Sequence, residues 1–253
     1  MKLTNRIYLV GSGTFGFDLT HNLDCHVYLI DGGDELALVD AGIGLSTDEI
    51  LENIKAEGFS LEKIKYLLLT HTHADHAGGA AWMKQVLGCD VLVSKDSADF
   101  LRNGDEDAIN LTFGKQAGFY PEDYRFEACG VDRELAEGDI ISVGDCKIKV
   151  LDTPGHCLGH LAFYFESIAA DLQTTLIAHL FDGDCIFWGG KILLQNIYDC
   201  ILQDYVNSIK KLAKLSVDVF LPGHMTFSLK NGQRHIDAAA QAVNKLGVPP
   251  NLI

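Results

Sequence analysis

The 253-residue sequence predicts an α/β (α+β) protein built from two β-rich halves with helices on their outer faces. Two observations predict this class. Strand-like segments are followed by helical ones, and this succession repeats in the second half of the chain. Hydrophobic residues also make up 47% of the chain, which is enough to bury a full core. One large domain or two fused halves would both fit, and we expect a single domain over residues 1–253.

The predicted strands are short apolar runs, and they cover residues 27–30, 36–40, 66–69, 91–93, 148–151, 161–165, 175–177 and 217–221. The predicted helices show apolar residues at helical spacing, and they cover about residues 46–58, 79–87, 201–212 and 235–246. At the start of the first helix, Ser46 is followed three residues later by Glu49, which predicts a capping box.

The segment HTHADH at residues 71–76 is the most informative stretch, because it offers four metal ligands directly after an apolar strand. Imidazole and carboxylate groups suit zinc, or another first-row metal that accepts nitrogen and oxygen ligands. His71 and His73 are two apart in an extended segment and point to the same side. Asp75 and His76 fall where the chain turns into a helix, so they aim at a neighbouring point. The segment therefore predicts two metal positions.

Three further segments carry ligand-type residues beside predicted strands: TPGHCLGH at 153–160, GDCIF at 183–187 and LPGH at 221–224. Together with the first motif, and in this order, they resemble the metallo-β-lactamase superfamily, in the branch of dinuclear hydrolases similar to glyoxalase II. The resemblance runs over about residues 27–224. It implies a four-layer αββα sandwich, with metals held by loops at one edge of the paired sheets.

Carried over residue by residue, the resemblance implies two metal sites that share a bridging carboxylate. The first would be held by His71, His73 and His156, the second by Asp75, His76 and His224, and the bridge would be Asp184. The expected cofactors are two divalent ions, zinc first, with iron or manganese as alternatives. Such ions lie ~3.5–4 Å apart and lower the pKa of bound water to about 7, so a bridging hydroxide can act as nucleophile at neutral pH. Asp75 is the candidate catalytic side chain, because it could accept the hydroxide's proton.

Three other residues are candidates for supporting roles. Asp40, at a strand end, matches a family position that supports the ligand loop, with simple turn formation as the alternative. His160 is expected to donate a hydrogen bond behind the ligands or to help its loop turn. Lys191 is a candidate substrate contact, because glyoxalase II enzymes hold glutathione's carboxylates with basic residues. A solvated loop lysine is the alternative.

Residues 95–139 form a possible lid insertion between the halves, with many aromatic and acidic residues and short helices expected at 98–102 and 108–117. In this family the equivalent insertion often covers the metal site and shapes substrate choice. An aromatic-lined lid would favour a substrate with an apolar portion. The alternative is that these aromatic residues only pack the insertion onto the core.

The residues around the predicted bridge help to rank substrates. Asp184 counts against antibiotic hydrolysis, because the β-lactam hydrolases generally lack this aspartate. Homoserine-lactone hydrolases usually carry a tyrosine three residues later, where this chain has Phe187, as glyoxalase II does. The predicted function is therefore metal-dependent hydrolysis of a small carbonyl ester or thioester. Lactonase and mononuclear-iron persulfide dioxygenase are the alternatives, and a non-catalytic binding module would usually have lost a ligand.

Composition limits the partners and the compartment. A formal charge of −15 without a cluster of Lys and Arg argues against a nucleic-acid partner. Seven cysteines without a C-x-x-C pair indicate reduced thiols, and the opening apolar run is too short for a secretory signal. No run approaches the ~20 apolar residues of a membrane span. We expect a cytoplasmic protein that acts on a small molecule, and because relatives are commonly dimers, a homodimer is compatible with this interpretation.

Overall fold

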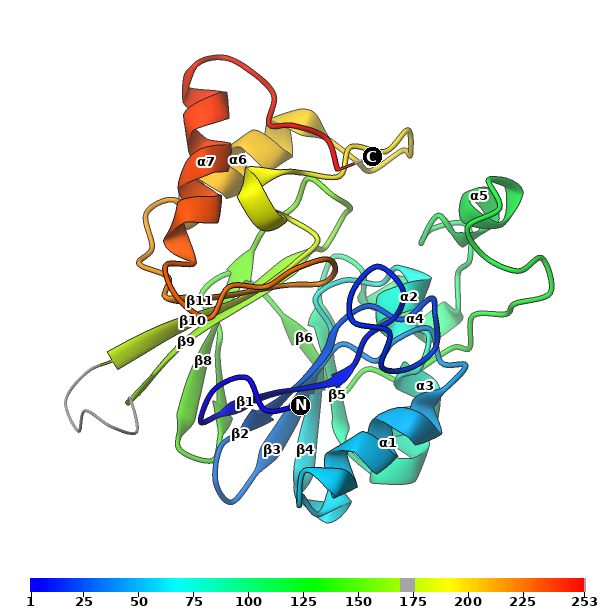
Figure 1. The fold of residues 1–253 in the computed structure, drawn as a ribbon. Coiled ribbons are helices and arrows are strands. Elements are labelled where there is room, and N and C mark those ends of the chain that lie inside the picture. The colour runs from blue at the N-terminus through cyan, green and yellow to red at the C-terminus, as the bar shows by residue number, and fades with distance from the viewer. Residues whose placement is uncertain (169–175, 253) are drawn as a thin grey trace.

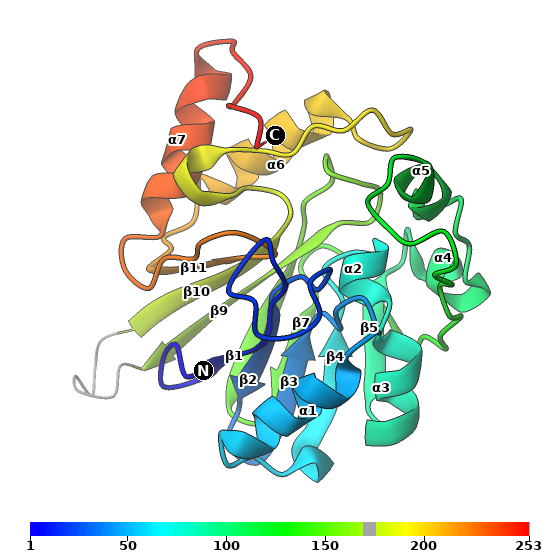
Figure 2. The same cartoon turned by 45° about the vertical axis from the view of Figure 1, so that its right-hand side comes forward.

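The computed structural model describes residues 1–168 and 176–252, in which two sheets pack face to face between outer helices (Figures 1 and 2). The first sheet has six strands, in the order β1 (Ile7–Gly11), β2 (Val27–Asp31), β3 (Leu36–Val39), β4 (Ile64–Leu68), β5 (Asp90–Ser94) and β6 (Arg133–Leu135). The second has five, in the order β11 (Val219–Pro222), β10 (Leu176–Gly183), β9 (Leu161–Ile168), β8 (Cys146–Asp152) and β7 (Ile140–Val143).

The helices fall into three groups. Those against the first sheet are α1 (Thr47–Ala56), the short α2 (Ala74–Ala77) and α3 (Ala80–Leu87), with the 3₁₀ turn η1 (Leu61–Lys63). Those of the insertion are α4 (Ala98–Asn103) and α5 (Leu111–Gln116). Those over the second sheet are α6 (Leu202–Leu212) and α7 (Gln233–Asn244), with the 3₁₀ turn η2 (Trp188–Gly190).

Three hydrophobic clusters separate four layers. Along β1, Ile7 and Leu9 point into the cluster between the sheets, whereas Tyr8 and Val10 point into the cluster under the helices of the first sheet. This alternation is the period of two that a strand imposes on its side chains. A third cluster, which includes Tyr205 of α6, lies between the second sheet and its helices. The predicted αββα sandwich is therefore confirmed.

The main predicted strands and helices are confirmed to within a few residues, but several details differ. The prediction of a capping box is wrong. The Ser46 side chain makes no capping hydrogen bond, and the Ser46 backbone carbonyl accepts the Glu49 N–H at 3.1 Å. The strand expected at 175–177 is the start of the much longer β10, with Thr175 outside the described residues. The polar His179 and Asp182 interrupt the apolar pattern of β10, which explains why the sequence predicted only its beginning.

Three strands were not predicted. The first strand, β1, is apolar throughout and was recognised only as an apolar run. The short β6 and β7 have only three and four residues, so their alternation is too brief to distinguish them from loops. Among the described residues, no helix has both the length and the apolar character needed to cross a membrane.

Within residues 95–139, the segment predicted as an insertion, β6 belongs to the first sheet, whereas the part around α5 is attached to the loops of the second sheet. Asn110 donates its Nδ2–H to Asp199 Oδ1 at 2.9 Å, and Asp199 Oδ2 accepts the backbone N–H of Leu158 at 2.9 Å. The Tyr198 hydroxyl donates to the backbone carbonyl of Ala108 at 2.7 Å. One carboxylate therefore joins the insertion to the loop between β8 and β9.

Candidate metal centre

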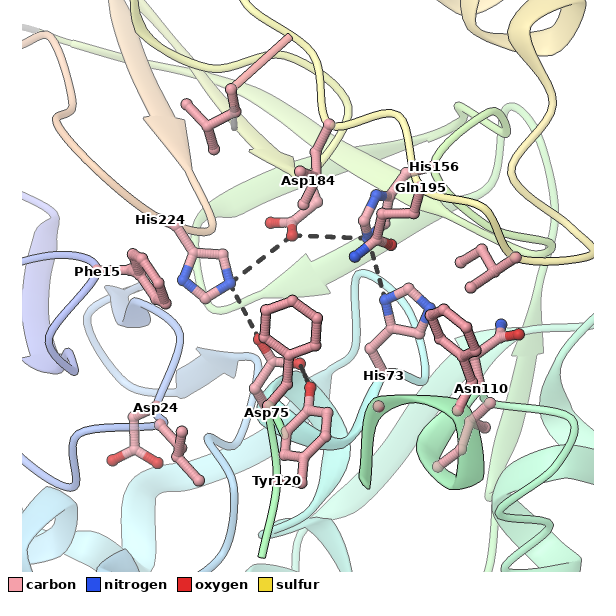
Figure 3. Close-up of a pocket in the computed structure, with 18 of the residues that line it drawn as sticks. Phe15, Asp24, His73, Asp75, Asn110, Tyr120, His156, Asp184, Gln195 and His224 are labelled. Carbon is pink, nitrogen blue, oxygen red and sulfur yellow. Dashed lines mark hydrogen bonds and ion pairs between the residues drawn. The ribbon is translucent and has the colours of Figure 1, made fainter. Parts of the chain in front are cut away.

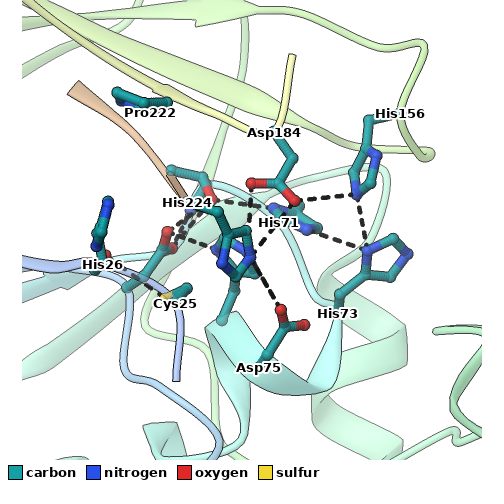
Figure 4. A network of polar contacts seen from close by, with 12 residues as sticks. Cys25, His26, His71, His73, Asp75, His156, Asp184, Pro222 and His224 are labelled. Atoms are coloured by element: carbon teal, nitrogen blue, oxygen red, sulfur yellow. Dashed lines mark hydrogen bonds and ion pairs between the residues drawn. The ribbon is translucent and has the colours of Figure 1, made fainter. Parts of the chain in front are cut away.

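The seven predicted ligands come together where loops of both sheets meet, and Figure 4 labels all of them except His76. The first sheet contributes the four that follow β4, and α2 begins directly after His73. The second sheet contributes His156 from the β8–β9 loop, Asp184 just after β10 and His224 just after β11. Since β8, β10 and β11 all run in the same direction, their carboxyl ends lie at one edge of the sheet.

The first cluster is a set of three histidine nitrogens. His71 Nε2 lies 3.1 Å from His73 Nδ1, and His156 Nε2 lies 3.0 Å from the same His73 nitrogen. His71 and His156 are fully buried, since at most 1% of either residue is exposed. Three imidazole nitrogens that converge in this way could hold a divalent metal ion, and such a set is typical of metal sites that keep a position open.

The second cluster contains one carboxylate and two histidines. His224 Nε2 lies 3.1 Å from Asp75 Oδ2 and 3.2 Å from His76 Nε2. His76 Nε2 is 3.7 Å from the same carboxylate oxygen. The mixed nitrogen and oxygen donors suit a divalent first-row metal.

Asp184 lies between the clusters and faces both. Its Oδ1 is 3.5 Å from His76 Nε2, and its Oδ2 is 3.6 Å from His156 Nε2 and 3.7 Å from His224 Nε2. Asp184 Oδ1 is also buried and has no hydrogen-bond partner in the described part of the chain. A buried carboxylate oxygen of this kind requires compensation, which a cation would supply.

Asp40 orients ligands of both clusters from behind. The Thr70 hydroxyl donates its single proton to Asp40, at 2.8 Å from Oδ2, so it must accept a hydrogen bond from His71 Nδ1 at 3.0 Å. His76 Nδ1 likewise donates to Asp40 Oδ2 at 2.9 Å. The Nε2 atoms of both histidines are therefore the ones turned toward the clusters, as metal ligation requires.

His160 supports the loop that carries Asp184. Its Nε2 accepts the backbone N–H of Asp184 at 3.0 Å, and its Nδ1 pairs with Thr153 Oγ1 at 2.9 Å. The His160 ring therefore accepts a hydrogen bond on the side of the metal centre, whereas the sequence predicted that it would donate one. Gly183 has a φ of +51°, and a Cβ there would lie 2.6 Å from His160 Nε2, so glycine is required.

Charge and burial set opposite pKa shifts within the clusters. Burial lowers the pKa of His71 and of His156, so both stay neutral and available as ligands. Burial raises the pKa of the Asp184 carboxyl, but His224 and His76 outweigh it and hold that pKa well below its usual range. Burial lowers the pKa of His76, yet the surrounding Cys25 and carboxylates raise it well above 6.5. Metal binding at the second cluster would therefore release a proton from His76.

A cavity of about 170 Å³ opens onto both clusters (Figure 3). Its walls are mainly apolar and include Phe15, Leu23, Ile109, Phe113, Phe119, Phe187, Leu193, Ile197, Met225 and Leu252. Among the described residues that line it, none is Lys or Arg, whereas Asp24, Asp75 and Asp184 all contribute. Lys191 is exposed and does not belong to this lining.

The insertion contributes a polar contact that the sequence did not reveal. The Tyr120 hydroxyl donates to Asp75 Oδ1 at 2.8 Å. Burial and the nearby Asp75 raise the pKa of Tyr120 well above 10, so the hydroxyl keeps its proton. No motif surrounds Tyr120, and the only signal was the abundance of aromatic residues in the insertion. Phe113 and Phe119, from the same segment, also face the cavity.

Residues 22–224 match the family description of the metallo-beta-lactamase superfamily, and because this match spans most of the chain, the protein belongs to that superfamily. A hydroxyacylglutathione hydrolase of Rhodospirillum rubrum is 31% identical over 187 residues, which cover 71% of this chain and 58% of that enzyme. An acyl-coenzyme A thioesterase of Gallus gallus is 26% identical over 239 residues, which cover 88% of this chain and 79% of that enzyme. The chain spans about half the length of the hydroxyacylglutathione hydrolases it matches.

Solved structures show the same fold. A subclass B3 metallo-beta-lactamase of Bradyrhizobium japonicum superposes with a TM-score of 0.74 at 24% identity, covering 97% of this chain and 91% of that one. A class B3 di-zinc metallo-beta-lactamase from an Alaskan soil metagenome also gives a TM-score of 0.74, at 22% identity and the same coverage. At this level of identity the likeness establishes the fold alone.

Proposed function

We propose that this protein is a hydrolase that uses two divalent metal ions, zinc first, to cleave a thioester or ester with an apolar acyl group. The observation that carries the proposal is the arrangement of seven ligand-type side chains in two clusters, with Asp184 facing both. When bound, the metals supply an activated water at neutral pH and positive charge for the developing oxyanion. His71, His73 and His156 would hold one ion. Asp75, His76 and His224 would hold the other.

The remaining residues would hold and orient these ligands. Asp40 fixes the ring orientation of His71 through Thr70, and that of His76 directly. Asp75 has its Oδ2 in the second cluster, while Tyr120 occupies its Oδ1. Each oxygen of Asp75 therefore already has a partner, and Asp75 could accept a proton from the nucleophile only at one of these two oxygens. Its proposed role as proton acceptor remains a prediction.

The cavity favours an uncharged, apolar acyl group. Apolar side chains from the β1–β2 loop, the insertion and the segment after η2 surround it, and a carbonyl carbon placed at the metals would have its acyl chain among them. Among the described residues of the lining there is no Lys or Arg to pair with carboxylates of glutathione or of a β-lactam. The relatives named acyl-coenzyme A thioesterase and hydroxyacylglutathione hydrolase, and Phe187 in place of a tyrosine, support a thioester over a lactone.

The test is to measure kcat/KM of the zinc-loaded protein on a glutathione thioester, a coenzyme A thioester, an acyl-homoserine lactone and a cephalosporin. We expect thioesters to be preferred, with faster turnover as the acyl group becomes more apolar. Preference for the lactone would change the substrate class. Inactivity on all four, together with oxygen consumption by the iron-loaded protein on a persulfide, would overturn the hydrolase assignment.

A further inference from the structure

We propose that Tyr120 is a positioning residue for the second metal site, because its hydroxyl holds Asp75 so that only one carboxylate oxygen faces that site. The inference rests on the proposed metal centre. The insertion would then help to position a metal ligand, in addition to lining the cavity over the centre.

The two oxygens of Asp75 have separate partners. Oδ2 lies 3.1 Å from His224 Nε2, within the second cluster. Oδ1 lies 2.8 Å from the Tyr120 hydroxyl, on the other side of the carboxylate. A carboxylate held in this way presents one oxygen to a metal, since rotation toward bidentate binding would break the Tyr120 hydrogen bond.

Asp75 needs such a restraint more than Asp184 does. Its side chain is 18% exposed, against 4% for Asp184, and it belongs to a helix of only four residues. Within the described residues, Tyr120 is the one partner of the Asp75 side chain outside the ligand set. His71 and His76 are oriented by other means, through Asp40. Tyr120 therefore does for Asp75 what Asp40 does for two of the histidines.

Packing within the insertion fixes the Tyr120 ring. A Cβ on Gly114 of α5 would lie 2.7 Å from a ring carbon, so the ring rests directly on the helix backbone. On another side the ring stacks with Tyr124, with centroids 6.4 Å apart and planes 25° apart. Tyr124 is itself anchored, because its hydroxyl donates to the Ile43 carbonyl at 2.8 Å. The hydroxyl of Tyr120 is thus aimed at Asp75 by its surroundings.

Tyr120→Phe tests this inference, because it removes the hydroxyl and keeps the ring. Tyr198→Phe is the matched control, since its hydroxyl also holds the insertion, through the Ala108 carbonyl, but touches no ligand. Zinc dissociation constants would be measured by competition with a chromophoric chelator, alongside kcat, KM and the midpoint of thermal unfolding. For Tyr120→Phe we expect the weaker zinc ion to bind about 10- to 100-fold less tightly, with a comparable fall in kcat and unchanged KM. Tyr198→Phe should keep the zinc affinity of the natural sequence.

Each other result overturns the inference in a distinguishable way. Natural zinc affinity and kcat in Tyr120→Phe would refute the positioning role and leave the proposed function intact. Equal losses in both variants would assign the effect to attachment of the insertion rather than to the Asp75 contact. Failure of the unmodified protein to bind two zinc ions would overturn the proposed function as well.

Discussion

The two sheets build the metal centre in different ways. The first sheet supplies four ligands within six residues, from one loop and a single turn of helix after β4. The second supplies one ligand from each of three loops that are tens of residues apart in sequence, joined only by the pairing of β8, β9, β10 and β11. The first set is therefore a local property of the chain. The second exists only once the sheet has formed.

The largest effect should come from Asp184→Ala, because this residue of the second sheet faces both clusters. We expect the variant to lose both ions and kcat/KM to fall on the order of 1,000-fold or more. Elemental analysis of the dialysed protein together with the thioester assay checks this. If the variant kept both ions and its turnover, Asp184 would not join the two clusters.

Asp75→Asn probes the local set of the first sheet. The amide keeps the shape of the side chain and an acceptor for Tyr120, but removes the charge that faces His224. We expect kcat to fall about 10- to 100-fold, with little change in the midpoint of thermal unfolding. Steady-state kinetics and a melting curve check this. An unchanged kcat would show that catalysis does not depend on the negative charge of Asp75.

Gly223→Ala tests how closely the two ligand sets approach each other. A Cβ at this position would overlap Asp184 Oδ1 and lie 2.7 Å from His76 Cε1, so ligands from both sheets would have to move. We expect weaker zinc binding and a free energy of unfolding lower by about 1–3 kcal/mol. Chelator competition and denaturant unfolding measure these. Gly130→Ala is the control, since its nearest neighbour would be 3.6 Å away.

At neutral pH the smallest effect on the free energy of unfolding should come from the protonation of His26, at the contact between the sheets, because this effect appears only as the pH falls. Its backbone N–H donates to the Gly223 carbonyl at 2.7 Å, and its Nε2 lies 2.9 Å from the Met225 carbonyl. Burial lowers the pKa of His26 to about 3, whereas an unfolded chain protonates histidine near 6.5. The unfolded state therefore binds more protons between these values, and the free energy of unfolding should decrease as pH falls through that window.

Denaturant unfolding of the chelator-treated protein between pH 7 and pH 4 measures this decrease. His26→Gln should flatten part of the slope, because one histidine that must stay neutral is removed. His160, whose pKa burial also lowers to about 3, should account for a further part. A slope identical in His26→Gln and the natural sequence would contradict the assignment.

Local patterns predicted most of the fold and four of the seven candidate ligands. His71, His73, Asp75 and His76 could be recognised from spacing alone, because a strand and one helical turn decide where they point. His156, Asp184 and His224 were identified only by resemblance, since no spacing rule links residues that tertiary pairing brings together. Alternation over three or four residues was too brief to reveal β6 and β7.

The contacts of the insertion could not be predicted for a similar reason. Whether Tyr120 or Tyr124 reaches a ligand depends on how α5 packs against the ring, and composition does not encode that packing. The capping box failed because Ser46 and Glu49 use backbone groups where the motif expects side chains. That no Lys or Arg is among the described residues of the cavity wall likewise became visible only when the wall was assembled.

Asp199 couples the position of the insertion to the position of a ligand loop. The same carboxylate holds Asn110 of the insertion and the backbone of Leu158, two residues beyond His156. Under the proposed function, an acyl group too bulky to lie beneath the insertion would displace Asn110 and, through Asp199, move the loop that carries His156. Substrates above the size limit should then show a lower kcat as well as a higher KM, because a displaced Asn110 would also shift His156 at the metal centre.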